Sequence, residues 1–262
     1  MNRLDYLIDY LLKEEPRYSE MQVPSDLQGK RDLFRALRNV RWPKPISDEF
    51  LRFQDEELQA QLLEKGVVEL NACRDAINRV STDKQLLVWQ GDITRLKVDA
   101  IVNAANSQML GCFHPLHKCI DNAIHSAAGL QLREECYQLR LQQGHEEPTG
   151  QAKITGAYNL PCKYVIHTVG PIIPNGIPTK FQKEQLASCY LSIMACADEN
   201  CLESIAFCCI STGEFRFPNQ LAAEIAVQTV KDYLTEHPDC SVKQVVFNVF
   251  KDVDKEIYQR IL

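Results

Sequence analysis

Hydrophobic residues recur at helical spacing in the first part of the chain. Leu4, Leu7, Ile8, Leu11 and Leu12 fit one apolar stripe, and similar spacing continues over residues 33–40 and 50–65. Residues 1–82 carry many charges of both signs, one cysteine and no histidine. We therefore predict a helical N-terminal extension over residues 1–82, and we expect it to be a packing appendage without chemistry of its own.

From about residue 84 onward, short apolar runs alternate with longer helical patterns. The runs predict strands over residues 86–89, 98–103, 152–158, 164–169, 204–210 and 244–250. Helical spacing predicts helices over residues 121–143, 184–200, 218–234 and 252–261. Strands that alternate with helices of this length form a largely parallel sheet covered on both faces. We therefore predict an α/β domain over residues 83–262.

Charge and cysteine usage narrow the functional classes. The chain of 262 residues has a net charge of −6 and contains 11 cysteines. This acidic balance argues against a general nucleic-acid binder, because phosphates require a basic surface. No run of about 18 apolar residues predicts a membrane span, and the first residues lack the pattern of a secretory signal peptide. We therefore expect no membrane partner. Because the number of cysteines is odd and several lie in apolar runs, we expect the reducing environment of the cytoplasm.

Four polar or glycine-containing loops follow predicted strands. They cover residues 91–94, 103–122, 170–171 and 211–215. Ligand sites of α/β sheets lie beyond the carboxyl ends of the strands. We therefore expect these four loops to converge on one cleft.

Three of these loops carry side chains or backbone suited to a nucleotide. The backbone N–H groups of a strand-to-helix loop can bind a diphosphate without net positive charge, although such a loop is more often only a turn. Asp92 can accept hydrogen bonds from an exocyclic amine, or it can cap a turn. Asn103 and Asn106 offer a donor and an acceptor for ribose hydroxyls, or they bond locally to the backbone.

A cluster of possible metal ligands lies in the longest loop. Cys112, His117 and Cys119 have the spacing C-x4-H-x-C, and His114 is a fourth candidate. Two thiolates and an imidazole are suitable ligands for zinc. Three ligands would leave an open, catalytic position and four would close a structural site, whereas the alternative is a set of unrelated buried thiols. Asp121 lies two residues after Cys119. Considered alone, it could be the N-cap of the next helix.

The loops and strands together resemble the macrodomain family. The matching segments are QGDIT (90–94), VDAIVNAANS (98–107), IDNAIHSAAG (120–129), TGQAKITGAYNLP (149–161), YVIHTVGP (164–171) and AFCCISTGEFRFP (206–218), in the order of the family. The segment GCFHPLHKCIDNAIH (111–125) resembles the zinc-containing branch, in which a Cys and His cluster replaces the flexible glycine run. The resemblance implies a three-layer α/β/α sandwich with a mixed, mostly parallel central sheet, preceded by a helical extension.

The resemblance also implies an activity and its partners. Members of the family bind ADP-ribose, and some hydrolyse its bond to a modified protein. The resemblance implies a protein-ADP-ribose hydrolase with one zinc ion per chain. The alternatives are a non-catalytic protein that binds ADP-ribosylated proteins and has a structural zinc, and an enzyme that acts on free ADP-ribose derivatives. A lipoyl carrier protein modified by a sirtuin-type ADP-ribosyltransferase is a partner by resemblance only. The side-chain linkage that is cleaved stays open.

Individual residues acquire roles through the same resemblance. Asp92, with Ile93, matches the adenine-binding position, and Asn106 matches the distal-ribose asparagine more closely than Asn103 does. Phe215 is a candidate to pack on the distal ribose. The implied catalytic residues are Asp121 and Asn106, the zinc ligands are Cys112, His117 and Cys119, and the remaining ADP-ribose contacts are Asn103, Ser211, Thr212, Gly213, Glu214 and Phe250. His114 is expected near the metal without binding it, and His125 is expected to pack or cap.

Overall fold

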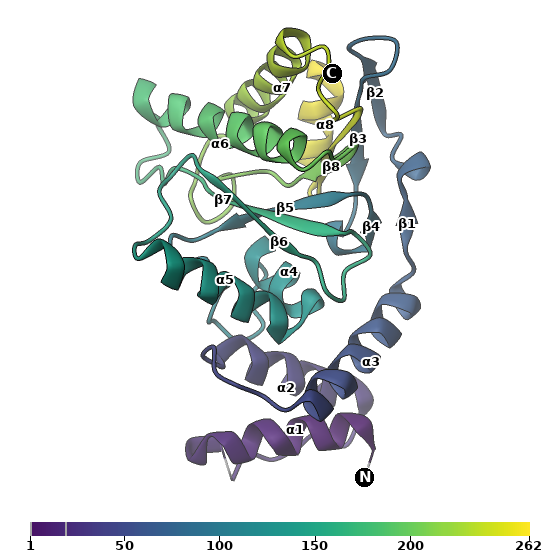
Figure 1. The fold of residues 1–262 in the computed structure, drawn as a ribbon, viewed down its shortest axis with the longest axis vertical. Coiled ribbons are helices and arrows are strands. Elements are labelled where there is room, and N and C mark those ends of the chain that lie inside the picture. Colours follow the sequence, from purple (N-terminus) through teal and green to yellow (C-terminus); the bar gives the residue numbers. More distant parts are fainter. Residues whose placement is uncertain (1, 19) are drawn as a thin grey trace.

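The computed structural model describes residues 2–18 and 20–262, and a seven-stranded mixed sheet forms its centre (Figure 1). Met1 and Ser19, which belong to the predicted extension, lie outside the described residues. The strand order is β2 (Ala76–Arg79), β3 (Gln85–Gln90), β9 (Gln244–Val249), β8 (Ser204–Phe207), β5 (Ala100–Ala105), β7 (Tyr164–Val169) and β6 (Ala152–Gly156). The two edge strands pair antiparallel, and the inner pairs are parallel. A separate parallel pair joins β1 (Val68–Glu69) to β4 (Leu96–Lys97).

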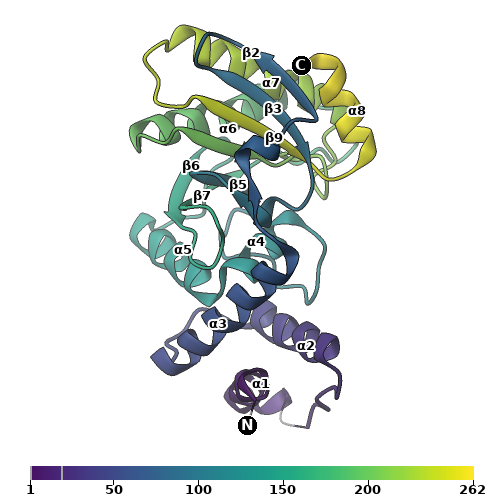
Figure 2. The ribbon, with the colours of Figure 1, turned by 90° about the vertical axis from the view of Figure 1, so that its right-hand side faces the viewer.

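Helices cover both faces of this sheet (Figures 1 and 2). One face carries α4 (Ile120–Ala128) and α5 (Leu130–Gln143), and the other carries α6 (Lys180–Glu199), α7 (Asn219–Glu236) and α8 (Asp252–Ile261). The predicted three-layer α/β/α fold with a mixed, mostly parallel sheet is therefore confirmed. No helix in the described ranges is long and apolar enough to cross a membrane.

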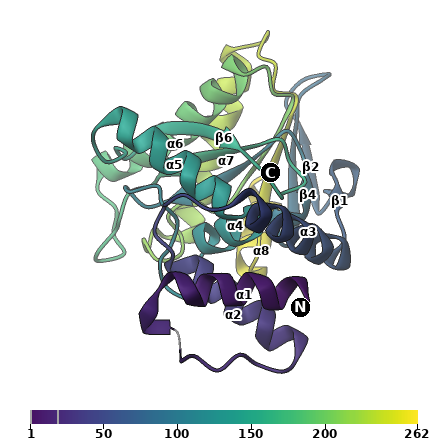
Figure 3. The same cartoon turned by 60° about the horizontal axis from the view of Figure 1, so that its bottom comes forward.

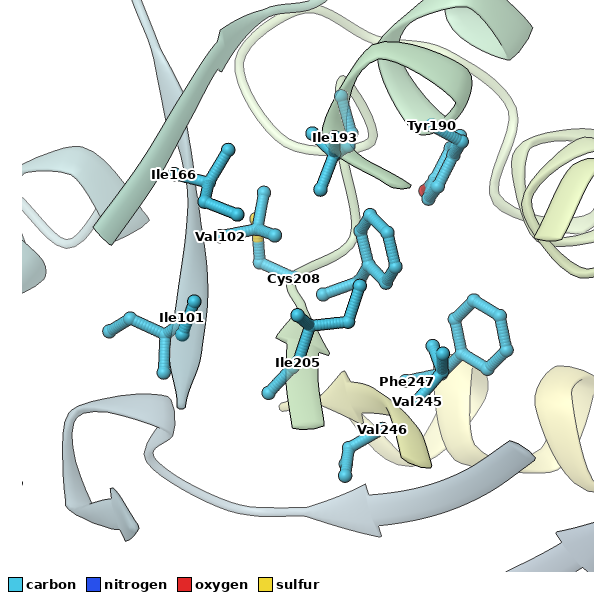
Figure 4. Packing of buried hydrophobic residues seen from close by; sticks show 14 of the residues in the cluster. Ile101, Val102, Ile166, Tyr190, Ile193, Ile205, Cys208, Val245, Val246 and Phe247 are labelled. Carbon is cyan, nitrogen blue, oxygen red and sulfur yellow. The ribbon is translucent and has the colours of Figure 1, made fainter. Parts of the chain in front are cut away.

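The inner strands are apolar because both of their faces are buried. Figure 4 shows Val102 and Ile205 from neighbouring strands packed with side chains of α6. The ring of Phe207 lies 5.0 Å from that of Tyr190 and 6.0 Å from that of Phe247, measured between centroids. Burying a large apolar side chain contributes about 1.5–3 kcal/mol. This core fixes the positions of the strand ends, where the candidate site lies.

The first three helices form a second hydrophobic cluster at one end of the molecule (Figures 1 and 3). We call α1 (Arg3–Glu14), α2 (Leu27–Val40) and α3 (Asp48–Lys65) the N-terminal module. Asn2, Asp26 and Ser47 cap their N-termini with side-chain hydrogen bonds. The module packs against α4 and α5, and Leu130 of α5 completes its cluster.

The helical part of the extension ends before residue 82. Gly66, with φ of 78°, ends α3, and short elements follow it. Strand β2 then pairs with β3, with Ala76 opposite Val88, so residues 76–79 belong to the sheet and not to a helical appendage.

A single predicted helix over residues 121–143 is two helices in the structure. Gly129, with φ of 103° and ψ of 178°, separates α4 from α5. This backbone conformation is essentially restricted to glycine. A Cβ atom there would lie 2.7 Å from both Gln131 Oε1 and Gln54 Nε2. The pattern of apolar residues continues across the break, so periodicity alone gave no sign of it.

Two glycine substitutions test this break. We expect Gly129→Ala to lower the free energy of unfolding by more than about 2 kcal/mol, because strained backbone and close contacts combine. Gly144→Ala is the matched control: its φ is also positive, at 77°, but nothing lies within 4 Å of the added Cβ. The control should lose only about 1 kcal/mol. Urea denaturation followed by circular dichroism measures both, and equal losses would contradict the packing argument.

Candidate active site

A cavity of about 1100 Å³ lies at the carboxyl ends of the inner parallel strands. Strands β3, β9, β8 and β5 run in the same direction, so the loops that follow them meet at one edge of the sheet. Apart from Asn103, every predicted site residue lines this cavity: Asp92, Ile93, Asn106, Cys112, His117, Cys119, Asp121, Ser211, Thr212, Gly213, Glu214, Phe215 and Phe250. The expected convergence of the loops is therefore present.

The loop after β3 combines a turn-stabilising role with a place at the cavity. Asp92 Oδ1 accepts hydrogen bonds from the Thr94 N–H at 3.0 Å and from Thr94 Oγ1 at 2.6 Å. Asp92 therefore caps a short 3-10 helix and lines the cavity as well. At the end of the neighbouring strand β9, Phe250 is 77% exposed and therefore does not belong to the core.

The loop after β8 presents unpaired backbone donors. The N–H groups of Gly213, Glu214 and Phe215 find no acceptor among the residues that the structure describes. Ser211 has φ of 64°, and its buried Oγ atom likewise lacks a partner in the described part of the chain. Gly170 packs directly on Ser211, and a side chain at residue 170 would displace it. A concave set of free N–H groups of this kind suits an anion such as a diphosphate.

Cys112, His117 and Cys119 come together at one wall of the cavity. Their ligand atoms all lie within 4.8 Å of one another, and Cys112 Sγ is 3.7 Å from His117 Nδ1. Zn–S and Zn–N bonds of usual length at tetrahedral angles would place S and N about 3.6 Å apart. The three side chains are half-buried, so the donor set and its spacing fit zinc with one side open to the cavity. Burial, together with the neighbouring Cys112 thiol, raises the pKa of the Cys119 thiol to about 12, against the lowering effect of the Asn122 N–H.

The surroundings of these three residues also match those of metal-binding histidines. His117 Nε2 faces Glu214 Oε1 at 3.7 Å, and a carboxylate commonly orients the free nitrogen of a metal-binding imidazole. His114 lies outside the three-residue group; its ring centroid is 5.9 Å from that of His117. Glu214 was predicted only as part of the nucleotide-binding loop. Its contact with His117 joins two loops that are far apart in sequence, and no local pattern indicates it.

Asp121 lines the same cavity and is almost fully buried. Its Oδ1 accepts a hydrogen bond from Asn103 Nδ2 at 2.8 Å, and its Oδ2 accepts one from Asn106 Nδ2 at 3.4 Å. His125 Nε2 lies 3.5 Å from Oδ1. Burial raises the pKa of Asp121 to about 6, against the lowering effect of the Asn103 hydrogen bond. The alternative that Asp121 caps the helix is wrong: Cys119 is the N-cap of α4, and its Sγ accepts from the Asn122 N–H at 3.4 Å.

Asn103 requires a correction, since it was predicted to contact the ribose. It is fully buried and does not line the cavity. Its side-chain amide donates one hydrogen to Asp121 and approaches His167 Nδ1 at 3.1 Å. Asn103 lies within β5, where its side chain has no exposed surface to offer to a ligand. It acts on the carboxylate of Asp121 instead.

His167 completes this buried network, and sequence analysis did not single it out. If Asn103 Nδ2 donates to His167 Nδ1, the ring carries its proton on Nε2, which lies 2.9 Å from Thr155 Oγ1. Burial lowers the pKa of His167 to about 3, so the ring is neutral. The one available sign was a histidine inside the otherwise apolar strand YVIHTV.

A second group of potential ligands is better described as part of this network. Side-chain atoms of His125, Cys136 and His167 also lie within 4.8 Å of one another, and all three residues are buried. Both nitrogens of His167 have hydrogen-bond partners, and the charge of Arg133, after burial, lowers the pKa of His125. The charge of Arg133 disfavours a second positive charge at this position. We therefore interpret these three residues as uncharged side chains that pack around Asp121 and support it.

Arg35 is the other functional candidate that sequence analysis missed. It belongs to α2, yet it lines the same cavity as Cys112, His117 and Cys119. The extension that was expected to contribute only packing therefore reaches the cavity at this position. In the sequence, Arg35 is one of many charged residues of the extension, and no local pattern distinguishes it.

The neutral state of His167 predicts a pH dependence of stability. Its pKa is about 3 in the folded protein and about 6.5 in an unfolded chain, so stability is complete above pH 6.5 and falls with decreasing pH. His125, whose ring centroid lies 6.1 Å away, contributes with the same sign. His167→Gln should reduce the slope between pH 6.5 and 4.5 by up to about 1.4 kcal/mol per pH unit. Urea denaturation across this range measures the slope, and an unchanged slope would show that folded His167 binds a proton.

Comparison with known proteins agrees with this geometry. The model of the Macro domain family matches residues 102–226. A protein-ADP-ribose hydrolase of Treponema medium is 52% identical over 98% of this chain and 97% of its own length. One from Staphylococcus aureus strain MRSA252 is 48% identical over 98% of this chain and 94% of its own.

Solved structures show the same relationship. A macrodomain of Oceanobacillus iheyensis with ADP has a TM-score of 0.63 and 37% identity, covering 71% of this chain and 93% of that one. A Trypanosoma brucei macrodomain in complex with ADP-ribose has a TM-score of 0.64 and 28% identity, covering 86% of this chain and 94% of that one. The chain therefore belongs to the Macro domain family.

Proposed function

We propose that this protein is a zinc-dependent hydrolase that removes ADP-ribose from ADP-ribosylated protein side chains. One observation carries the proposal: three features share one cavity. They are the unpaired backbone N–H groups of residues 213–215, the buried carboxylate of Asp121 and the cluster of Cys112, His117 and Cys119. The full-length similarity to proteins named protein-ADP-ribose hydrolase supports the same activity.

The strand-end loops would hold the nucleotide end of the substrate. Free N–H groups of residues 213–215 suit the diphosphate, and Asp92 with exposed Phe250 suits the adenine. Lys251 and Arg35 also line the cavity, which offsets part of the negative charge of a bound diphosphate. Binding energy from this part of the substrate would fix the distal ribose near the cavity wall that carries Cys112, His117 and Cys119.

The reaction would take place at the cavity wall that carries Cys112, His117 and Cys119. Water displaces the protein side chain at the anomeric carbon of the distal ribose, through a transition state that resembles an oxocarbenium ion. When bound by Cys112, His117 and Cys119, zinc would supply a Lewis acid at this wall. Asn106, which lines the cavity, would orient the ribose hydroxyls. Asp121 would place a carboxylate beside the reacting carbon, held at a fixed angle by Asn103 and Asn106.

The nature of the modified protein follows only from the family resemblance. We propose a mono-ADP-ribosylated protein as substrate and include, among the substrates to be tested, a lipoyl carrier protein modified by a sirtuin-type ADP-ribosyltransferase. Ser-, Asp/Glu- and Arg-linked ADP-ribose should be compared side by side. The 11 cysteines are free thiols, which supports the proposal of a cytoplasmic location.

Replacement of one ligand separates metal binding from nucleotide binding. Cys112→Ser should lose its zinc and release ADP-ribose from modified protein more than about 100-fold more slowly, because Lewis-acid stabilisation is lost. Its dissociation constant for free ADP-ribose should change only a few-fold. Cys201→Ser, at an exposed cysteine outside the cavity, is the control and should match the unsubstituted protein. Metal analysis, calorimetry and single-turnover assays provide the three readouts.

Chelation of the unsubstituted protein adds a reversible version of this test. Activity should disappear with the zinc and return when zinc is restored. One zinc per chain and ADP-ribose binding, without release from any linkage, would instead indicate a reader with a structural metal. A metal-free protein with full activity would refute the role of zinc.

A further inference from the structure

Helix α2 contacts the loop that carries the metal-binding residues. We call residues 112–119 the ligand loop. Arg35 Nη2 donates a hydrogen bond to the backbone oxygen of His117 at 3.1 Å. Asn39 Oδ1, one turn further along α2, accepts one from the backbone N–H of Leu116 at 3.0 Å. The N-terminal module therefore holds the main chain at His117 and at the residue before it.

Asn122 extends this contact to the two cysteines. Its Oδ1 accepts a hydrogen bond from Arg35 Nη2 at 2.7 Å, and its backbone N–H donates to Cys119 Sγ at 3.4 Å. Its Nδ2 donates to the backbone oxygens of His114 at 3.0 Å and of Cys112 at 3.4 Å. Asn122 is fully buried. The side-chain amide of Asn122 therefore links Arg35 to the start of the ligand loop, and the backbone N–H of the same residue contacts the cysteine at its end.

The ligand loop needs such external contacts. Leu116 has φ of 56°, a left-handed conformation that is strained for a residue with a branched side chain. The Leu116 side chain is 41% exposed and anchors the loop poorly, whereas its N–H group is bonded to Asn39. Strained backbone persists where surrounding contacts fix it.

Helix α2 is itself fixed to the body of the protein. Buried Arg133, on α5, donates from Nη1 to the backbone oxygens of Arg38, Asn39 and Arg41 at 2.7–2.9 Å. Arg38 in turn donates to the backbone oxygen of Ser126 on α4 at 3.0 Å. Figures 1 and 3 show α2 lying along α4. A helix bound in this way offers Arg35 and Asn39 from a defined position.

We propose that the N-terminal module is a working part of the metal site, in which Arg35 is a positioning residue for the three metal ligands. Arg35 makes no described hydrogen bond to the three ligand side chains. It binds the backbone of His117 and the amide of Asn122, and its Nε donates to the Ser126 hydroxyl on α4 at 3.2 Å. Such supporting contacts typically change metal affinity 10- to 100-fold. The inference rests on the proposed zinc site, and it assigns to residues outside the α/β domain a role in forming that site.

The test compares arginines of one helix. Arg35→Ala removes the contacts to the ligand loop, whereas Arg31→Ala removes contacts to Glu57 and Glu64 within the N-terminal module. Competition with a chromophoric chelator gives the zinc dissociation constant of each variant. Hydrogen–deuterium exchange of metal-free protein gives the protection of a peptide spanning residues 113–118. The second readout does not depend on zinc or on activity.

We expect Arg35→Ala to raise the zinc dissociation constant about 10- to 100-fold and to speed exchange in the ligand loop. Arg31→Ala should leave both unchanged. Arg35→Lys, which keeps the charge but not the forked geometry, should recover only part of the affinity. Asn39→Ala removes the contacts to Leu116 and to the Ser126 hydroxyl but keeps those of Arg35. It provides a second variant if Arg35→Ala fails to fold, and it should also speed exchange.

Two results would overturn the inference, and they have different meanings. Wild-type zinc affinity and exchange in folded Arg35→Ala and Asn39→Ala would refute the positioning role while leaving the zinc hydrolase intact. An unsubstituted protein that binds no zinc at the ligand loop would refute the proposed function, and this inference with it.

Discussion

The parallel pairing of β3, β9, β8 and β5 is the constraint on which the rest of the structure depends. It brings four carboxyl strand ends to one edge, so that loops more than 100 residues apart in sequence face a common cavity. The apolar core that packs both faces of these strands fixes the edge, and the loops need only supply donors, acceptors and thiols. A change that shifted one inner strand would therefore move one wall of the cavity relative to the other.

Buried polar groups around the cavity must be paired, because an unpaired polar group in a protein interior is costly. Two networks pair many of these groups, although Asn103 Oδ1 and Ser211 Oγ have no partner among the described residues. Below the cavity, Asp121, Asn103, His167 and Thr155 form one chain of contacts. At its side, Arg35 and Asn122 form another with the ligand loop. The first orients a carboxylate and the second orients the backbone of the ligand loop, so each network supports a different part of the proposed chemistry.

Sequence reasoning succeeded where the determining interactions are local. Apolar periodicity located most helices and strands, although it missed strand β2 and the helix break at Gly129. The spacing of Cys112, His117 and Cys119 within eight positions already indicated a cluster. It failed where a role depends on a contact between distant segments. The side chain of Arg35 reaches residues more than 80 positions away. Asn103 and Asn106 look alike in sequence, but Asn103 lies within β5 and is buried, whereas Asn106 follows the end of the strand and lines the cavity.

The central claim is that zinc is bound by two thiolates and one imidazole at the cavity wall. X-ray absorption at the zinc K-edge, on the purified protein, tests it directly. The account predicts two sulfur scatterers at about 2.3 Å and a nitrogen at about 2.0–2.1 Å, with one further light atom. A shell of one sulfur and two imidazoles would place the metal at His125, Cys136 and His167 instead. That shell, or the absence of sulfur ligands, would contradict the account.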